Sequence, residues 1–139
     1  MAKTWTQGKM RQAYSRGKQG KRPDLDNRYF RSSWEANYAR YLNFLVKQKN
    51  IHKWDYEVDT FFFDEIKRGT RSYMPDFKIW ETESSEPYYI EVKGWMDDKS
   101  RTKLNRMAKY FPCIKIVLIQ KKEYMEIQRK LKNLIPFWE

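Results

Sequence analysis

Apolar residues recur at helical spacing in three segments of the chain. In the first segment, residues 32–48, they repeat every three or four positions: Trp34, Tyr38, Tyr41, Leu42 and Leu45. Ser32 stands at the start of this segment as a candidate N-cap. Similar spacing predicts a second helix over residues 99–111 and a third over residues 122–131.

Between the first two helices, apolar and polar residues alternate in a way that predicts β-strands. Extended runs cover residues 52–64, 72–81 and 88–95, and the polar turn 82–87 separates the last two. These three runs are expected to form an antiparallel meander. Residues 114–120 are almost wholly apolar, which predicts a central strand that is buried on both faces. The predicted fold class is therefore α/β, with a mixed sheet flanked by helices.

Positive charge is concentrated at the N-terminal end. Residues 1–31 hold nine lysines and arginines against Asp24 and Asp26, which gives +7 of the chain's net +11. We interpret residues 1–28 as a basic arm, flexible when unbound, and residues 29–139 as a single domain. The arm lacks the apolar face of a membrane-lying helix, so nucleic acid is favoured over an acidic membrane surface, and a solubilising tail remains the alternative. The candidate DNA contacts here are Lys9, Arg11, Arg16, Lys18, Lys21, Arg22 and Arg31.

Composition excludes several classes of protein. A single cysteine, Cys113, rules out an intrachain disulfide framework and fits a reducing, intracellular setting. No apolar run approaches the ~20 residues of a membrane span, so no membrane association is expected. The chain also lacks a glycine-rich phosphate loop, so no nucleotide cofactor is expected. One histidine and one cysteine are too few for a zinc site.

The two strands around the polar turn bring three charged residues towards one point. In the run at residues 88–95, alternation places Glu91 and Lys93 on the same face of the strand. Asp76 begins the preceding strand, after Pro75, which suits a strand start because it lacks an N–H. If the two strands pair through the turn, Asp76 lies near Glu91 and Lys93.

Two carboxylates and an ammonium group are what hydrolysis of a phosphodiester requires. Mg²⁺ prefers oxygen ligands, which Asp76, Glu91 and the Val92 carbonyl can provide. Lys93 can orient the attacking water or stabilise negative charge in the transition state. The competing interpretation is an ordinary solvent-facing Glu-Lys pair with Asp76 as a turn residue.

These residues also carry a resemblance to a known family. MPDF at residues 74–77 and EVKG at residues 91–94 resemble the PD-(D/E)xK nuclease motif. Together with FRSSWE at residues 30–35, LIPFW at residues 134–138 and the basic arm, they are similar in order to the bacteriophage endonuclease I family of Holliday-junction resolvases. The similarity spans nearly the whole chain, although the stretch between Asp76 and Glu91 is longer than in compact family members.

The resemblance implies a restriction-endonuclease-like core with two Mg²⁺ ions per active site, for which Mn²⁺ would substitute. It implies that Glu35 is a further acidic metal ligand, which makes the expected catalytic set Glu35, Asp76, Glu91 and Lys93. It also implies a homodimer, with or without exchanged strands, that cuts branched DNA in the cytoplasm of a bacterial host if the protein is viral. The alternative for Glu35 is a capping box, in which its carboxylate would serve the Ser32 backbone.

Three further basic residues have two possible roles, and the sequence is compatible with functions other than junction resolution. Lys99, Lys103 and Arg106 share one face of the second helix, which suits either a DNA phosphate near the scissile bond or solvent. Alternatives to a junction resolvase are a sequence-specific endonuclease of restriction, homing or transposase type, and a non-catalytic DNA-binding module. A nuclease directed at RNA is also compatible with the sequence.

Overall fold

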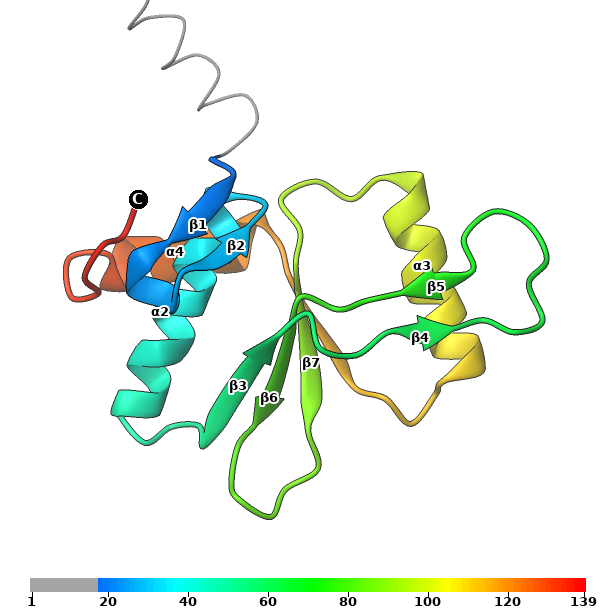
Figure 1. The fold of residues 1–139 in the computed structure, drawn as a ribbon, viewed down its shortest axis with the longest axis horizontal. Coiled ribbons are helices and arrows are strands. Elements are labelled where there is room, and N and C mark those ends of the chain that lie inside the picture. Colours follow the sequence, from blue (N-terminus) through cyan, green and yellow to red (C-terminus); the bar gives the residue numbers. More distant parts are fainter. Residues whose placement is uncertain (1–17) are drawn as a thin grey trace, which may run out of the picture.

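A four-stranded mixed sheet lies at the centre of the structure, a computed structural model that describes residues 18–139 (Figure 1). The strand order is β3–β6–β7–β8, in which β3, β6 and β7 are antiparallel and β8 runs parallel to β7. Their bounds are Lys53–Tyr56, Phe77–Trp80, Tyr88–Val92 and Ile116–Ile119. Helices flank this sheet, so the predicted α/β class and the predicted antiparallel meander are confirmed.

Strand β8 is an edge strand, so the prediction of a central strand was wrong. It follows helix α3, Asp98–Tyr110, because a parallel strand can only be reached through a crossover connection. The apolar composition has a different cause. Ile116 packs against a small core beneath α3, whereas Val117 packs against the main core beneath α2, Ser33–Lys47. The two faces of β8 are therefore each covered by a different apolar cluster.

The strand predicted over residues 52–64 is divided in two at Glu57. This residue adopts a left-handed backbone conformation with φ of 51°, which ends β3 at Tyr56. The chain then forms β4, Phe61–Phe62, which pairs with β5, Ser72–Tyr73, as a separate two-stranded hairpin. Figure 1 shows this hairpin extending away from the sheet beside α3.

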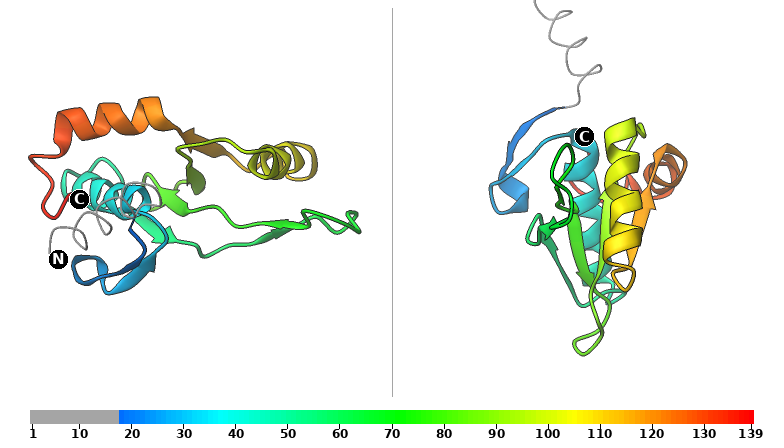
Figure 2. Two further views of the ribbon diagram at one scale, coloured as in Figure 1. Left: turned by 90° about the horizontal axis from the view of Figure 1, so that it is seen from above. Right: turned by 90° about the vertical axis from the view of Figure 1, so that its right-hand side faces the viewer.

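Helix α2 is the central helix of the main core. Its predicted N-cap is confirmed, because the Ser32 side chain accepts a hydrogen bond from the Glu35 N–H. The helix lies between α4, Lys121–Leu131, and the N-terminal hairpin (Figure 2). The Trp34 indole stacks on the Tyr124 ring of α4 with centroids 4.0 Å apart, which joins the two helices.

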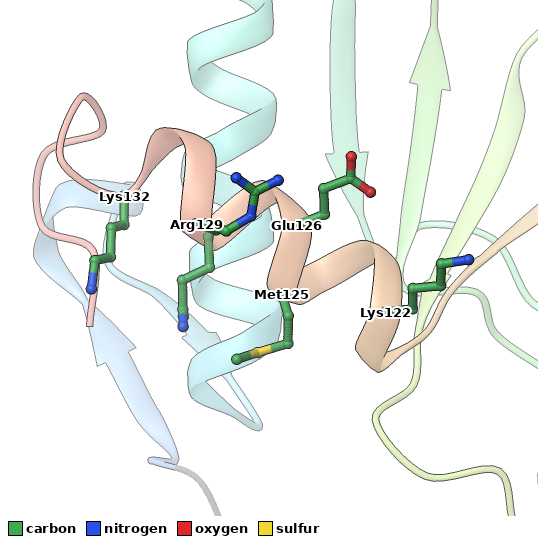
Figure 3. A pocket seen from close by; sticks show the side chains of 6 residues that line it. Lys122, Met125, Glu126, Arg129 and Lys132 are labelled. Atoms are coloured by element: carbon green, nitrogen blue, oxygen red, sulfur yellow. The ribbon is translucent and has the colours of Figure 1, made fainter.

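The outer side of α4 carries charged side chains around the exposed Met125. Lys122, Met125, Glu126, Arg129 and Lys132 line a shallow open surface along it (Figure 3). Glu126 pairs with Lys130 one helical turn on, at 2.9 Å, as is common on a solvated helix face. Among residues 18–139, no helix has the length and apolar character needed to cross a bilayer.

The folded unit begins earlier than residue 29, which corrects the predicted boundary between arm and domain. Residues 20–30 form a β-hairpin, in which β1, Gly20–Arg22, pairs with β2, Arg28–Phe30, around the 3-10 turn η1, Pro23–Leu25. Leu25 and Phe30 are buried in the main core, which fixes the hairpin on the domain. The proposed contacts Lys9, Arg11 and Arg16 lie outside the described residues.

Arg22 is buried in an ion network and does not form part of an exposed DNA-binding surface, which corrects its predicted role. Its guanidinium donates to both carboxylate oxygens of Glu139, at 2.9 and 2.8 Å. Arg40 of α2 donates to the same carboxylate at 2.8 Å and binds Asp24 through two hydrogen bonds. A buried guanidinium needs such partners, because leaving its charge unpaired would cost several kcal/mol. The network ties the hairpin, α2 and Glu139 together.

Acid is expected to weaken this network at Glu139. Partial burial of the Glu139 carboxyl opposes ionisation, but hydrogen bonds from Arg22, Arg40 and Ser33 outweigh it and lower the pKa to about 2. Because the folded-state pKa lies below the ordinary value, the stabilisation is complete above about pH 4.5 and is lost as the pH falls towards 2.

The measurement is the free energy of unfolding of wild type and Glu139→Gln across this pH range. The difference between the two proteins should be largest near neutral pH and should shrink between pH 4.5 and 2. Exposed Glu83→Gln is the control and should show a small, flat difference. A Glu139→Gln difference that stays constant with pH would contradict the assignment.

Candidate active site

The β6–β7 hairpin places Asp76 beside Glu91. Phe77 pairs with Ile90, so the same register continued by one residue sets Asp76 opposite Glu91. The Val92 N–H donates a hydrogen bond to Asp76 Oδ2 at 2.8 Å, which fixes this carboxylate across the end of the hairpin. The long turn at residues 82–87 lies at the other end of these strands, remote from both acids (Figure 1).

A pocket of about 330 Å³ opens at this end of the hairpin. It brings together all the residues proposed for catalysis or metal binding from the sequence, namely Glu35, Asp76, Glu91, Val92 and Lys93. Arg31 and Lys103, both proposed as DNA contacts, also line it. Acidic and basic side chains thus share a single hollow that is mostly polar.

Glu35 turns its carboxylate towards this pocket. Its Oε1 accepts a hydrogen bond from the Tyr56 hydroxyl at 2.9 Å, and its Oε2 accepts one from the Ser32 hydroxyl at 3.0 Å. A full capping box would instead direct the Glu35 carboxylate to the Ser32 backbone N–H. Ser32 therefore caps the helix, while the Glu35 side chain remains available to the site.

Glu57 is an acidic residue of the site that the sequence analysis missed. Carboxylate oxygens of Glu35, Glu57 and Asp76 lie within 4.8 Å of one another. The Glu57 N–H donates to the Asp76 carbonyl at 2.9 Å, which sets the left-handed residue against the start of β6. The alternation over residues 52–64 predicted one continuous strand, and nothing in the residue spacing indicated a left-handed turn at Glu57.

Arg31 lies among these three acids. Its Nη2 atom is 3.8 Å from Glu35 Oε1 and 3.7 Å from Asp76 Oδ1, and it forms a close ion pair with Glu57. The Arg31 side chain is nevertheless 53% exposed. Arg31 thus belongs to the acidic site as well as to its rim.

The pKa values of Asp76 and Glu91 are raised in this pocket. Burial raises the pKa of Asp76 well above its ordinary range, and the nearby charges of Glu91 and Glu35 raise it further. Burial also raises the pKa of Glu91, although a hydrogen bond from the Tyr73 hydroxyl at 2.8 Å and the charge of Lys93 oppose this rise. A buried group of like charges is costly unless cations neutralise it.

The donor atoms of the pocket suit a hard divalent cation. Mg²⁺ is held in proteins by carboxylate and carbonyl oxygens, and four carboxylates and the Val92 carbonyl converge here. One group comprises Glu35, Glu57 and Asp76, and the other comprises Asp76, Glu91 and the Val92 carbonyl. The N–H and C=O of one strand residue point to the same edge, so the Val92 carbonyl faces the side of Asp76. Asp76 is common to both groups, and this is the arrangement that two neighbouring ions would need.

Gly94 has a packing role beside the pocket. A Cβ atom at this position would lie 3.2 Å from the Trp34 ring, which is closer than most such contacts. The indole cannot retreat easily because it stacks on Tyr124. Glycine after Lys93 therefore allows the end of β7 to approach α2, which carries Glu35.

The remaining proposed DNA contacts differ in their surroundings. Lys99 is exposed near the start of α3, and Lys18 and Lys21 are exposed at the N-terminal hairpin. Arg106 instead donates to the Thr70 carbonyl and is half-buried, so it supports the segment between β4 and β5. Exposed basic residues thus lie both near the pocket and on the hairpin.

Comparisons with protein-family models, with curated proteins and with solved structures find no match to this chain. The functional interpretation therefore depends on the pocket, its residues and their chemistry.

Proposed function

We propose that the protein is a metal-dependent endodeoxyribonuclease that hydrolyses phosphodiester bonds in four-way and other branched DNA. The observation that carries this proposal is the meeting of Glu35, Asp76, Glu91 and Lys93 in one pocket. They come from the start of α2 and from the end of the β6–β7 hairpin. A fixed group of buried carboxylates beside an ammonium group is costly to maintain, and such groups are most often found where chemistry needs them.

The proposed fold assignment is a restriction-endonuclease-like core. The order of elements supports it: a helix bearing one acid, an antiparallel meander bearing the other two acids and the lysine, and a crossover helix to a parallel strand. The motif spacing described above adds to this support. The four residues lie at one end of the sheet, where a DNA backbone can reach them.

The chemistry divides among the residues of the pocket. A bound Mg²⁺ would polarise the phosphate and lower the pKa of a water molecule. Asp76, Glu91 and the Val92 carbonyl would hold one ion, and Glu35, Glu57 and Asp76 would hold a second. Lys93 would place its ammonium group against the scissile phosphate and stabilise the negative charge that develops there. Lys103, on the pocket wall, would bind an adjacent phosphate.

The preference for branched DNA and the dimeric state are also part of the proposal. Their support is the similarity of the ordered motifs to phage junction resolvases, together with the net charge of +11. Two symmetric cuts need two active sites, and a homodimer supplies them. Affinity dominated by phosphate contacts should fall steeply with salt and depend little on sequence.

A cleavage assay tests this proposal against its rivals. A labelled four-way junction and its separate linear arms are incubated with the protein, with and without Mg²⁺. With Mg²⁺, we expect symmetric cuts near the branch point of the junction and little cutting of the linear arms. Without Mg²⁺, we expect no cutting of either substrate. Preference for one linear sequence would instead favour a sequence-specific endonuclease, and binding without any cutting would favour a non-catalytic DNA-binding module.

A further inference from the structure

We infer that Arg31 is an internal counter-cation, which holds the acidic site in the absence of metal and is displaced when a divalent ion enters. This inference rests on the proposed function, because it concerns how the same pocket takes up its metal. It assigns Arg31 a role that differs from simple DNA contact. The metal and the guanidinium compete for one set of carboxylates.

One guanidinium nitrogen of Arg31 lies among the three acids. Arg31 Nη2 is within 4 Å of carboxylate oxygens from Glu35, Glu57 and Asp76, so a single nitrogen faces all three acids. Its distance of 3.7 Å to Asp76 Oδ1 is too long for a hydrogen bond. The attraction to this buried carboxylate is therefore ionic, and a second cation can replace it.

The three acids are also spaced closely enough to hold one metal ion. Oxygens that lie within 4.8 Å of one another have a common point no more than about 2.8 Å from each. Metal–oxygen distances are roughly 2.0–2.6 Å for Mg²⁺ and Ca²⁺. Each carboxylate oxygen would therefore have to move towards the ion by roughly 0.2–0.8 Å. The guanidinium nitrogen and a metal ion cannot both lie beside this point, because they would repel each other at such a short distance.

The attachment of Arg31 lets its side chain move while the backbone stays fixed. Phe30 on one side is buried in the main core, and Ser32 on the other side caps α2. The Arg31 side chain itself is 53% exposed, so its guanidinium can turn towards the mouth of the pocket without disturbing the fold. The released guanidinium would then pair with a DNA phosphate at this mouth, as the ammonium group of Lys103 would.

The test is metal binding in the absence of DNA. Calorimetric titration with Mg²⁺ and with Mn²⁺ compares wild type with Arg31→Gln, which removes the charge but keeps a polar side chain. Arg101→Gln is the matched control, since Arg101 is exposed on α3 and pairs with Asp98 at 3.3 Å. Arg31→Gln should bind the ion roughly ten-fold more tightly or better, because a competing charge is gone. Arg101→Gln should match wild type.

A second measurement needs no substitution at Arg31. In wild-type protein, the side-chain Nε signal of Arg31 is followed by NMR during a Mg²⁺ titration, and it should shift and sharpen as the guanidinium is released. If Arg31→Gln fails to fold, this signal still shows whether Mg²⁺ displaces the Arg31 guanidinium.

The outcomes separate the two proposals. Equal or weaker metal affinity in a folded Arg31→Gln protein, or an Arg31 signal unchanged at saturating Mg²⁺, overturns the counter-cation role and leaves the nuclease proposal standing. Absence of metal binding in both proteins also overturns the counter-cation role, whereas the nuclease proposal is decided by Mg²⁺-dependent cleavage of the junction, since DNA phosphates can complete the metal site.

Discussion

An Asp76→Asn protein is expected to bind four-way junctions with nearly wild-type affinity and to cut them roughly 10³-fold more slowly or worse in Mg²⁺. Asp76 is common to both proposed groups of metal ligands, so its loss would weaken the binding of both ions. In the wild-type protein, the Val92 N–H donates to Asp76 Oδ2 at 2.8 Å. The asparagine side-chain oxygen can accept the same hydrogen bond, so the end of the hairpin should remain intact. The measurement is single-turnover cleavage of a labelled junction, with binding measured in Ca²⁺.

Two further variants sharpen this result. Lys93→Ala should also lose most cleavage while it retains binding, since the proposed role of its ammonium group is to stabilise charge on the reacting phosphate. Asp64→Asn, at an exposed position after β4, makes the same chemical change away from the pocket and should cut normally. Wild-type cleavage by either pocket variant would rule out the proposed site.

The largest expected effect on stability is at Arg40. Replacement of Arg40 by Met keeps the apolar stem of the side chain but removes a guanidinium that is only 6% exposed. Asp24 and Glu139 then face each other without this cation, and the Asn37 amide oxygen loses the hydrogen bond that Arg40 donates at 2.9 Å. Breaking a buried ion pair from one side costs about 3–5 kcal/mol.

Urea denaturation followed by circular dichroism measures this loss. Lys47→Met is the matched control, since Lys47 lies exposed in the last turn of the same helix. It should change the free energy of unfolding by no more than about 0.5 kcal/mol. A similar small change for Arg40→Met would show that the network contributes little to stability.

Local patterns were enough to predict the elements that build the site. The spacing of Trp34, Tyr38 and Leu42 marked α2, and Ser32 marked its start. Strict alternation put Glu91 and Lys93 on one face, and the polar turn implied the pairing that brings Asp76 to Glu91. In each case the information lies within a few residues of sequence, where backbone geometry leaves little choice.

The features that were missed depend on contacts between distant segments. Arg22 looked like one more charge of a basic arm, and only its partner Glu139, at the other end of the chain, makes it a buried residue. Strand β8 looked central because two separate apolar clusters cover its two faces. Periodicity carries no information about which distant side chain will neutralise a charge or cover a strand.

Engineering the protein for greater stability would have to leave Glu57 unchanged. Its φ of 51° suits glycine or asparagine better than a longer side chain, so a search guided by backbone preference alone would select this position for replacement. The same conformation turns the Glu57 carboxylate towards Arg31 and its N–H towards the Asp76 carbonyl. Relief of the strain would therefore remove a member of the acidic site, and a gain in stability at this residue would come at the expense of the proposed nuclease activity.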